Sequence, residues 1–148
     1  MRLTFMLADS AQVQGGKIFV LGGGWNVTGP QALPSALTGI VRVEWSEANQ
    51  DHRLRFDLVS DDGAPFMAPT PSGPQPFHVE MSFQVGRPPG IAPGSELNVP
   101  FAINIGPLPL EPGRRYEWRP KIDGADFAED RLAFSMRQAP AGQQTAES

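Results

Sequence analysis

Cysteine is absent from this chain of 148 residues, and histidine and lysine are scarce. Without cysteine, the protein has no disulfide framework, no thiolate nucleophile and no cysteine-based zinc site. The two histidines, His52 and His78, are too few for a three-histidine metal centre. Only Lys17 and Lys121 are lysines, and the net charge of −4 at pH 7 provides no overall field that would attract nucleic acid. These absences remove several classes of metal site, redox site and nucleic-acid partner.

Long hydrophobic runs are also missing. The apolar stretch at the N-terminus is interrupted by Asp9 before it reaches the length of a signal-peptide core. No segment approaches the roughly 20 apolar residues that a membrane-spanning helix requires. Together with the lack of cysteine, this predicts a cytoplasmic protein without a membrane segment.

Glycine and proline are abundant, with 16 of each, and apolar residues recur at every second position. This pattern is typical of short strands that bury one face. We predict an all-β fold, a two-layer antiparallel β-sandwich of immunoglobulin-like plan with about eight strands. Residues 1–138 are expected to form a single domain and residues 139–148 a flexible tail. The predicted strands cover residues 3–7, 17–21, 41–45, 54–58, 79–85, 99–105, 116–122 and 132–136.

The aromatic residues occupy the apolar side of this alternation, which predicts their place in the core and argues against an exposed RNA-binding surface. The expected core aromatics are Phe5, Trp25, Trp45, Phe56, Phe83, Phe101, Trp118 and Phe134. Tyr116 follows the Pro112-Gly113 turn at the start of a strand, as in the tyrosine corner of β-sandwiches. Pro100 and Pro120 lie in strand-like segments and indicate edge strands or bulges, because proline donates no ladder hydrogen bond.

The most distinctive segment is the glycine run Gly22, Gly23 and Gly24, followed by Trp25. It lacks the Lys-Ser/Thr pair and the helix of a phosphate-binding loop. One interpretation is a bulge or tight turn in which the glycines clear space for Trp25 to pack on a sheet. The other is a binding site where a flat ligand or a partner's backbone lies against these four residues.

The opening motif Leu7-Ala8-Asp9-Ser10-Ala11-Gln12, followed by Gly16-Lys17-Ile18 and Leu21 to Trp25, resembles an uncharacterised family of short bacterial, largely actinobacterial, proteins. Segments at residues 45–49, 85–90 and 112–118 are similar as well. The resemblance covers most of residues 1–138. It implies a shared all-β fold, and no activity, cofactor or catalytic residue comes with it.

Other combinations of residues point weakly to chemistry. His52 and His78 are assigned to the polar sides of their strands, which predicts solvated surface histidines. The acidic residues Asp61, Asp62, Asp123, Asp126, Glu129 and Asp130 would form a calcium site only if they gathered at one end of the sandwich. No serine lies in a Gly-x-Ser-x-Gly elbow. We therefore expect no catalytic residue, metal site or cofactor.

The resulting hypothesis is a non-catalytic module that binds another protein or copies of itself. The alternative is a small-ligand or hydrolytic site at the loop end near Gly22–Gly24, which a concave apolar pocket there would favour.

Overall fold

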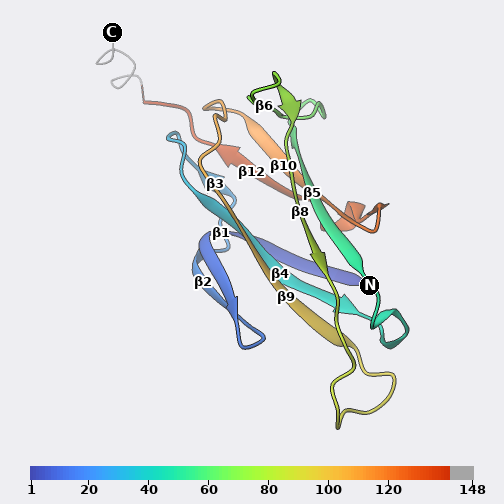
Figure 1. Ribbon diagram of the computed structural model, residues 1–148. Coiled ribbons are helices and arrows are strands. Elements are labelled where there is room, and N and C mark those ends of the chain that lie inside the picture. The colour runs from blue at the N-terminus through green and yellow to red at the C-terminus, as the bar shows by residue number, and fades with distance from the viewer. Residues whose placement is uncertain (141–148) are drawn as a thin grey trace.

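The computed structural model describes residues 1–140 and contains two main β-sheets (Figure 1). The first sheet has the order β2-β1-β4-β9, with all neighbours antiparallel. Its strands are β1 (Arg2–Gln14), β2 (Lys17–Gly23), β4 (Ser35–Val43) and β9 (Leu97–Ile105).

The second sheet has the order β3-β12-β10-β5-β8, and β11 also pairs with β10. Its neighbours are antiparallel except for β3 and β12, which run parallel. Its strands are β3 (Val27–Thr28), β5 (His52–Ser60), β8 (His78–Phe83), β10 (Arg115–Ile122), β11 (Ala125–Asp126) and β12 (Leu132–Met136). The remaining elements are the small hairpin of β6 (Met67–Ala68) and β7 (Gln75–Pro76) and the 3-10 helices η1 (Trp45–Glu47) and η2 (Ala128–Asp130).

The prediction of an all-β, antiparallel protein is confirmed, and eight strands in residues 1–140 have five or more residues. The 3-10 helix η1 follows directly after β4. None of the helices in this part of the chain has the length and hydropathy needed to cross a bilayer. The predicted tail lies largely outside the described residues.

One apolar core lies between the two sheets. The ring of Phe56, on β5, lies 4.9 Å from that of Phe5 and 5.9 Å from that of Phe101, both on the first sheet. Of the eight aromatics expected in the core, five are buried, whereas Phe5, Trp25 and Trp45 are half-buried and pack against it. Burial of these large apolar surfaces supplies the main driving force for folding.

The first sheet is curled, and the immunoglobulin-like plan is therefore not confirmed. Ala36, Leu37, Thr38 and Gly39 on β4 are all buried, so both faces of this strand are covered. On β9, the side-chain amide of Asn104 donates to the Ala11 carbonyl (2.8 Å) and accepts from the Ala11 N–H (3.2 Å). Asn104 thereby ties β9 to β1 across the intervening strand and holds the sheet as a half-barrel.

The two prolines behave differently. Pro100 lies on β9, an edge strand, as predicted. Pro120 lies on β10, a central strand, so the expectation of an edge position is wrong for this residue. On one side, β12 pairs with β10 only as far as Trp118, and β11 begins to pair only at Lys121. The ladder is interrupted between them, and proline fits there because no N–H is required.

Candidate functional site

The glycine run lies where the chain leaves the first sheet for the second (Figure 1). Gly22 and Gly23 end β2, and the Gly24 N–H donates to the Leu7 carbonyl at 2.8 Å. Gly22 and Gly24 have φ values of +60° and +91°, which glycine adopts without steric cost. A Cβ on Gly22 would also overlap the Asp9 side chain. The pairs Ala8–Gly23 and Ser10–Leu21 keep one register, so the end of β2 contains no bulge, and the chain bends at Gly24.

Trp25 packs on the second sheet directly after the turn. Its ring contacts Phe134, on β12, edge to face at 6.3 Å. The next two residues pair with β12 as strand β3, so the chain crosses between the layers at Trp25. Trp25 packs on a sheet as the structural interpretation expected, but the glycines do not clear space for it: a Cβ at Gly22 would meet Asp9, and one at Gly24 would meet nothing within 4 Å.

The indole N–H of Trp25 is buried and has no hydrogen-bond partner among the described residues. Leaving a buried donor unpaired usually costs about 1–3 kcal/mol, so such groups are rare in folded proteins. An exception of this kind calls for an explanation, such as an internal water or a ligand that supplies an acceptor.

A pocket opens beside Trp25 at this end of the molecule. Its empty volume, including the mouth, is about 530 Å³. Both sheets contribute to its wall, as do the loops at residues 28–34 and 106–110. The apolar lining comprises Leu7, Trp25, Leu33, Leu108, Leu110, Trp118, Phe134 and Met136, and the polar lining includes Asp9, Thr28, Gln31 and Ser35. The predicted site residue Trp25 is therefore part of a concave apolar pocket, whereas Gly22, Gly23 and Gly24 are not in its lining.

The loop residues of this pocket were not predicted from the sequence. Residues 31–34 and 106–110 have no alternation or motif that marks them as a binding wall. The signal that pointed to this place was Trp25 after the glycine run.

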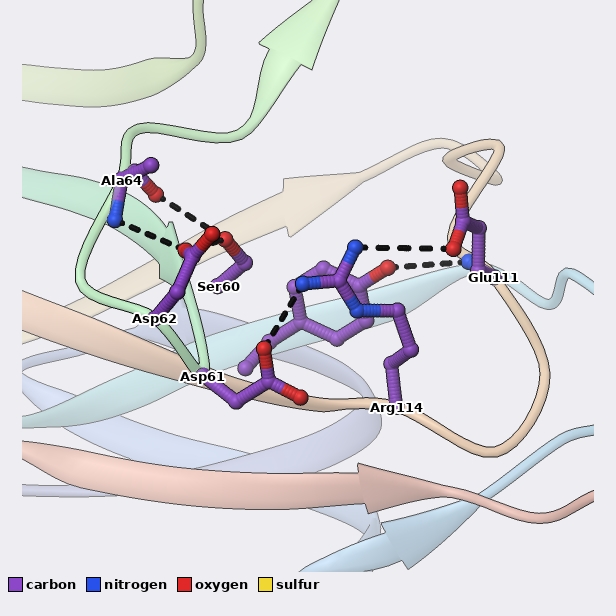
Figure 2. Close-up of polar contacts among 7 residues, drawn as sticks. Ser60, Asp61, Asp62, Ala64, Glu111 and Arg114 are labelled. Atoms are coloured by element: carbon purple, nitrogen blue, oxygen red, sulfur yellow. Dashed lines mark hydrogen bonds and ion pairs between the residues drawn. The ribbon is translucent and has the colours of Figure 1, made fainter.

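The predicted tyrosine corner is present at the beginning of β10 (Figure 2). The Tyr116 hydroxyl accepts a hydrogen bond from the Glu111 N–H at 2.9 Å. The Arg114 guanidinium beside it donates to Asp61 at 2.7 Å and lies 3.5 Å from Glu111. The hydrogen bond from Arg114 holds the pKa of Asp61 below its usual value. These groups join the loop before β10 to the turn after β5, which is a structural role.

His52 is buried, so the prediction of a solvated surface histidine is wrong for this residue. Its side chain is on the core face of β5, with the same parity as Leu54 and Phe56. Nδ1 lies 2.7 Å from the Asp123 carboxylate, and Nε2 lies 2.8 Å from the Glu47 carbonyl. Burial alone would lower the pKa of His52, but the bonds to Glu47 and Asp123 together raise it. Because both ring nitrogens are engaged, His52 has no free atom for general base catalysis. His78 is exposed, as predicted.

The acidic residues do not gather as a calcium site would require. Asp61 follows the end of β5, whereas Asp123 lies beside Arg53 near the beginning of that strand. Since these two groups are at opposite ends of one strand, the gathering that the calcium alternative needs does not occur. Within residues 1–140, no three His, Asp or Glu side chains are arranged to hold a metal ion.

Comparison with known proteins gives a family without an assigned role. No curated protein and no solved structure matches the chain. The model of a family described as "Family of unknown function (DUF6941)" matches residues 3–134. Because this match covers most of the sequence, the chain belongs to the DUF6941 family of unknown function.

Proposed function

We propose that the protein is a non-catalytic binding module that associates with a second copy of itself through the β2 edge, Lys17–Gly23. The observation that carries the proposal is an edge strand with exposed apolar side chains. In the described part of the chain, β2 pairs only with β1, which leaves the other side of its backbone free for another strand.

The side chains of the β2 edge are unusually apolar for such a position. Leu21 is 71% exposed and Phe19 is 51% exposed. They lie opposite Ser10 and Gln12 of β1 and therefore share one face of the hairpin. Natural edge strands are commonly protected by charges, prolines or bulges. The opposite edge strand, β9, contains Pro100, whereas β2 has no proline and a single charge at Lys17.

A second copy suits this edge because two such edges complement each other. An antiparallel pair of β2 strands forms one ladder across a two-fold axis, in which the same patch is used on both copies. This arrangement places the two Lys17 side chains at opposite ends of the pair, whereas a parallel arrangement would bring the like charges together. The apolar side chains of both copies would leave water on association.

The non-catalytic part of the proposal is supported by the state of the reactive groups. Both nitrogens of His52 are bonded, and Arg114 and Asp61 are paired in the tyrosine corner. The net charge of −4 supports a protein partner over a nucleic acid. The absence of cysteine supports a cytoplasmic location.

The oligomeric state tests the proposal. We expect sedimentation equilibrium at micromolar concentration to give twice the mass of one chain. Leu21→Lys should weaken association by at least about tenfold, because a charge would be placed in the centre of the apolar contact. Since Leu21 is exposed in the single chain, its replacement should leave the circular dichroism spectrum unchanged.

The matched control is Met67→Lys, which places the same charge on a side chain that is 47% exposed on the separate β6–β7 hairpin. It should keep the mass of the dimer. A wild-type protein that remains monomeric, or equal weakening by the two substitutions, would contradict pairing through β2.

A further inference from the structure

We propose that the β2 strands of two copies pair in one register, centred on Val20, and that Lys17 of each copy forms an ion pair with Asp9 of the other. This arrangement rests on the proposed function, and it specifies which residues of the two copies meet. Three features of the β1–β2 hairpin support it: the direction of its backbone groups, the positions of its apolar side chains and the charges at its two ends.

The hydrogen bonds of Ala11 show which backbone groups of β2 face the free edge. Both the N–H and the carbonyl of Ala11 bond to the side chain of Asn104 on β9, which lies on the other side of β1 from β2. Hydrogen-bonded and non-hydrogen-bonded pairs alternate along an antiparallel ladder. Val20, which is opposite Ala11, is therefore in a non-hydrogen-bonded pair. Its N–H and carbonyl point outward, as do those of Ile18 two residues earlier.

A two-fold axis at Val20 uses these outward groups and also joins the apolar side chains. Val20 of each copy forms the central hydrogen-bonded pair. Phe19 then lies opposite Leu21 of the other copy in a non-hydrogen-bonded pair, where the Cα atoms are only about 4.5 Å apart. Because Phe19 and Leu21 are both exposed and share one face of the hairpin, this apolar contact forms twice.

Two other registers keep the same backbone groups in the ladder, and both pair the side chains less well. An axis at Phe19 places the charged Lys17 opposite the apolar Leu21 of the other copy. An axis at Leu21 places Phe19 opposite Gly23, which offers no side chain, and leaves Lys17 beyond the end of the ladder. Only the axis at Val20 places each exposed apolar side chain opposite another one and Lys17 opposite Gly23.

The ends of this ladder have complementary charges. Asp9 lies over Gly22, since a Cβ on this glycine would overlap the carboxylate. With the axis at Val20, Lys17 lies opposite Gly23 of the other copy and is within reach of Asp9 on the neighbouring strand of that copy. Lys17 and Asp9 are exposed, and neither is in an ion pair within residues 1–140. The symmetry of the pair gives one such contact at each end.

Disulfide formation between single-cysteine variants reports the register, because the chain has no cysteine of its own. A mixture of Phe19→Cys and Leu21→Cys, oxidised with glutathione disulfide, should give covalent dimers on a non-reducing gel. Each variant alone should stay uncrosslinked, because its two cysteines would be diagonal neighbours about 7–8 Å apart, beyond the reach of a disulfide. Met67→Cys, on the separate β6–β7 hairpin, is the control and should not crosslink with either variant.

The outcomes separate the register from the association itself. Crosslinking of Phe19→Cys alone would place the axis at Phe19, and crosslinking of Leu21→Cys alone would place it at Leu21. Either result would overturn the register proposed here and leave association through β2 intact. A protein that sediments as a monomer and gives no crosslink in any mixture would overturn both proposals.

Charge reversal tests the ion pair. Lys17→Glu and Asp9→Lys should each weaken association by at least about threefold in sedimentation equilibrium, because like charges then meet at both ends of the ladder. Their mixture should associate as tightly as wild type, since opposite charges face each other again at both ends. A mixture of Lys17→Glu with Asp126→Lys, which alters an exposed carboxylate on β11, is the control and should stay weak. Equal association in the two mixtures would show that Lys17 does not meet Asp9.

Discussion

At the scale of single residues, removal of the Tyr116 hydroxyl tests how much the tyrosine corner contributes to stability. The ring is buried between Phe66 and Phe134, at centroid distances of 5.9 and 5.8 Å. Tyr116→Phe keeps this packing and removes only the bond from the Glu111 N–H. We expect the free energy of unfolding to fall by about 1 kcal/mol, measured by urea denaturation.

Arg114→Ala is the control for this substitution, because it removes the neighbouring ion pair with Asp61 and leaves the hydroxyl bond in place. Surface ion pairs contribute little, so its effect should be smaller than that of Tyr116→Phe. A loss below about 0.5 kcal/mol for Tyr116→Phe would show that the corner is unimportant for stability.

Residue roles differ in how far the sequence reveals them. Tyr116 could be predicted because the turn before it and the strand after it are both local features. His52 could have been placed in the core from its spacing to Leu54 and Phe56, but its polarity suggested the surface. Its partners, Asp123 and the Glu47 carbonyl, come from other segments of the chain, and the sequence does not indicate that they would compensate for burial.

At the scale of elements, we expect the side chain of Asn104 to stabilise the curl of the first sheet by joining β9 to β1. Its amide makes the contacts that a further strand would otherwise make with Ala11, which is only 7% exposed. Asn104→Ala leaves the N–H and the carbonyl of Ala11 without these partners. We expect a destabilisation of about 2–3 kcal/mol in urea unfolding and faster hydrogen exchange in β1 and β9.

Asn98→Ala supplies the matched change, since Asn98 is an exposed residue on the same strand. It should change stability by less than about 0.5 kcal/mol. If the two asparagine variants were equally stable, the bonds between Asn104 and Ala11 would not hold the half-barrel together.

The same curling explains where strand prediction succeeded and where it failed. Alternation identified the strands that have one face in the core and the other in water, such as β5 and β10. It missed the first half of β4, where Ala36 to Gly39 are all buried and the one polar side chain, Thr38, is buried and donates to the Phe101 carbonyl instead of facing water. A strand covered on both faces has no period of two, so the pattern cannot reveal it.

At the scale of the whole molecule, the pocket beside Trp25 forms where the chain crosses from the first sheet to the second. Its walls come from both sheets and from two loops that are more than 70 residues apart in the sequence. Spacing within one segment cannot predict such a site, because its residues meet only when the layers pack. The glycine run predicted only a bulge or tight turn before Trp25, and the crossing between the sheets, with positive φ values at Gly22 and Gly24, was not predicted.

His52 links the two sheets through one titratable group. Glu47 lies just after β4 of the first sheet, and Asp123 follows β10 of the second. The amino group of Met1 lies 3.5 Å from the Glu47 carboxylate, so the beginning of β1 joins the same cluster. The cluster therefore carries charge-assisted contacts across the core, and the pH should affect the stability of the whole domain.

The direction of this pH effect follows from the pKa shifts. The pKa of His52 is raised above 6.5, so its contribution is complete below that ordinary value and is lost as the pH rises through the folded value. Burial raises the pKa of Asp123, but the hydrogen bonds from His52 and the Arg53 N–H outweigh it and lower that pKa below 3.8. The contribution of Asp123 is therefore lost as the pH falls through its folded value. The pair of His52 and Asp123 therefore stabilises the fold most at pH values between the folded-state pKa of Asp123 and that of His52.

We expect the free energy of unfolding, measured in urea from pH 5 to pH 9, to decrease as His52 loses its proton. His52→Gln should remove most of this slope, because glutamine does not titrate in this range. His78→Gln, at the exposed histidine, should retain it. A wild-type curve that rises between pH 6 and pH 8, or equal slopes in wild type and His52→Gln, would show that the protonated imidazole does not hold the two sheets together.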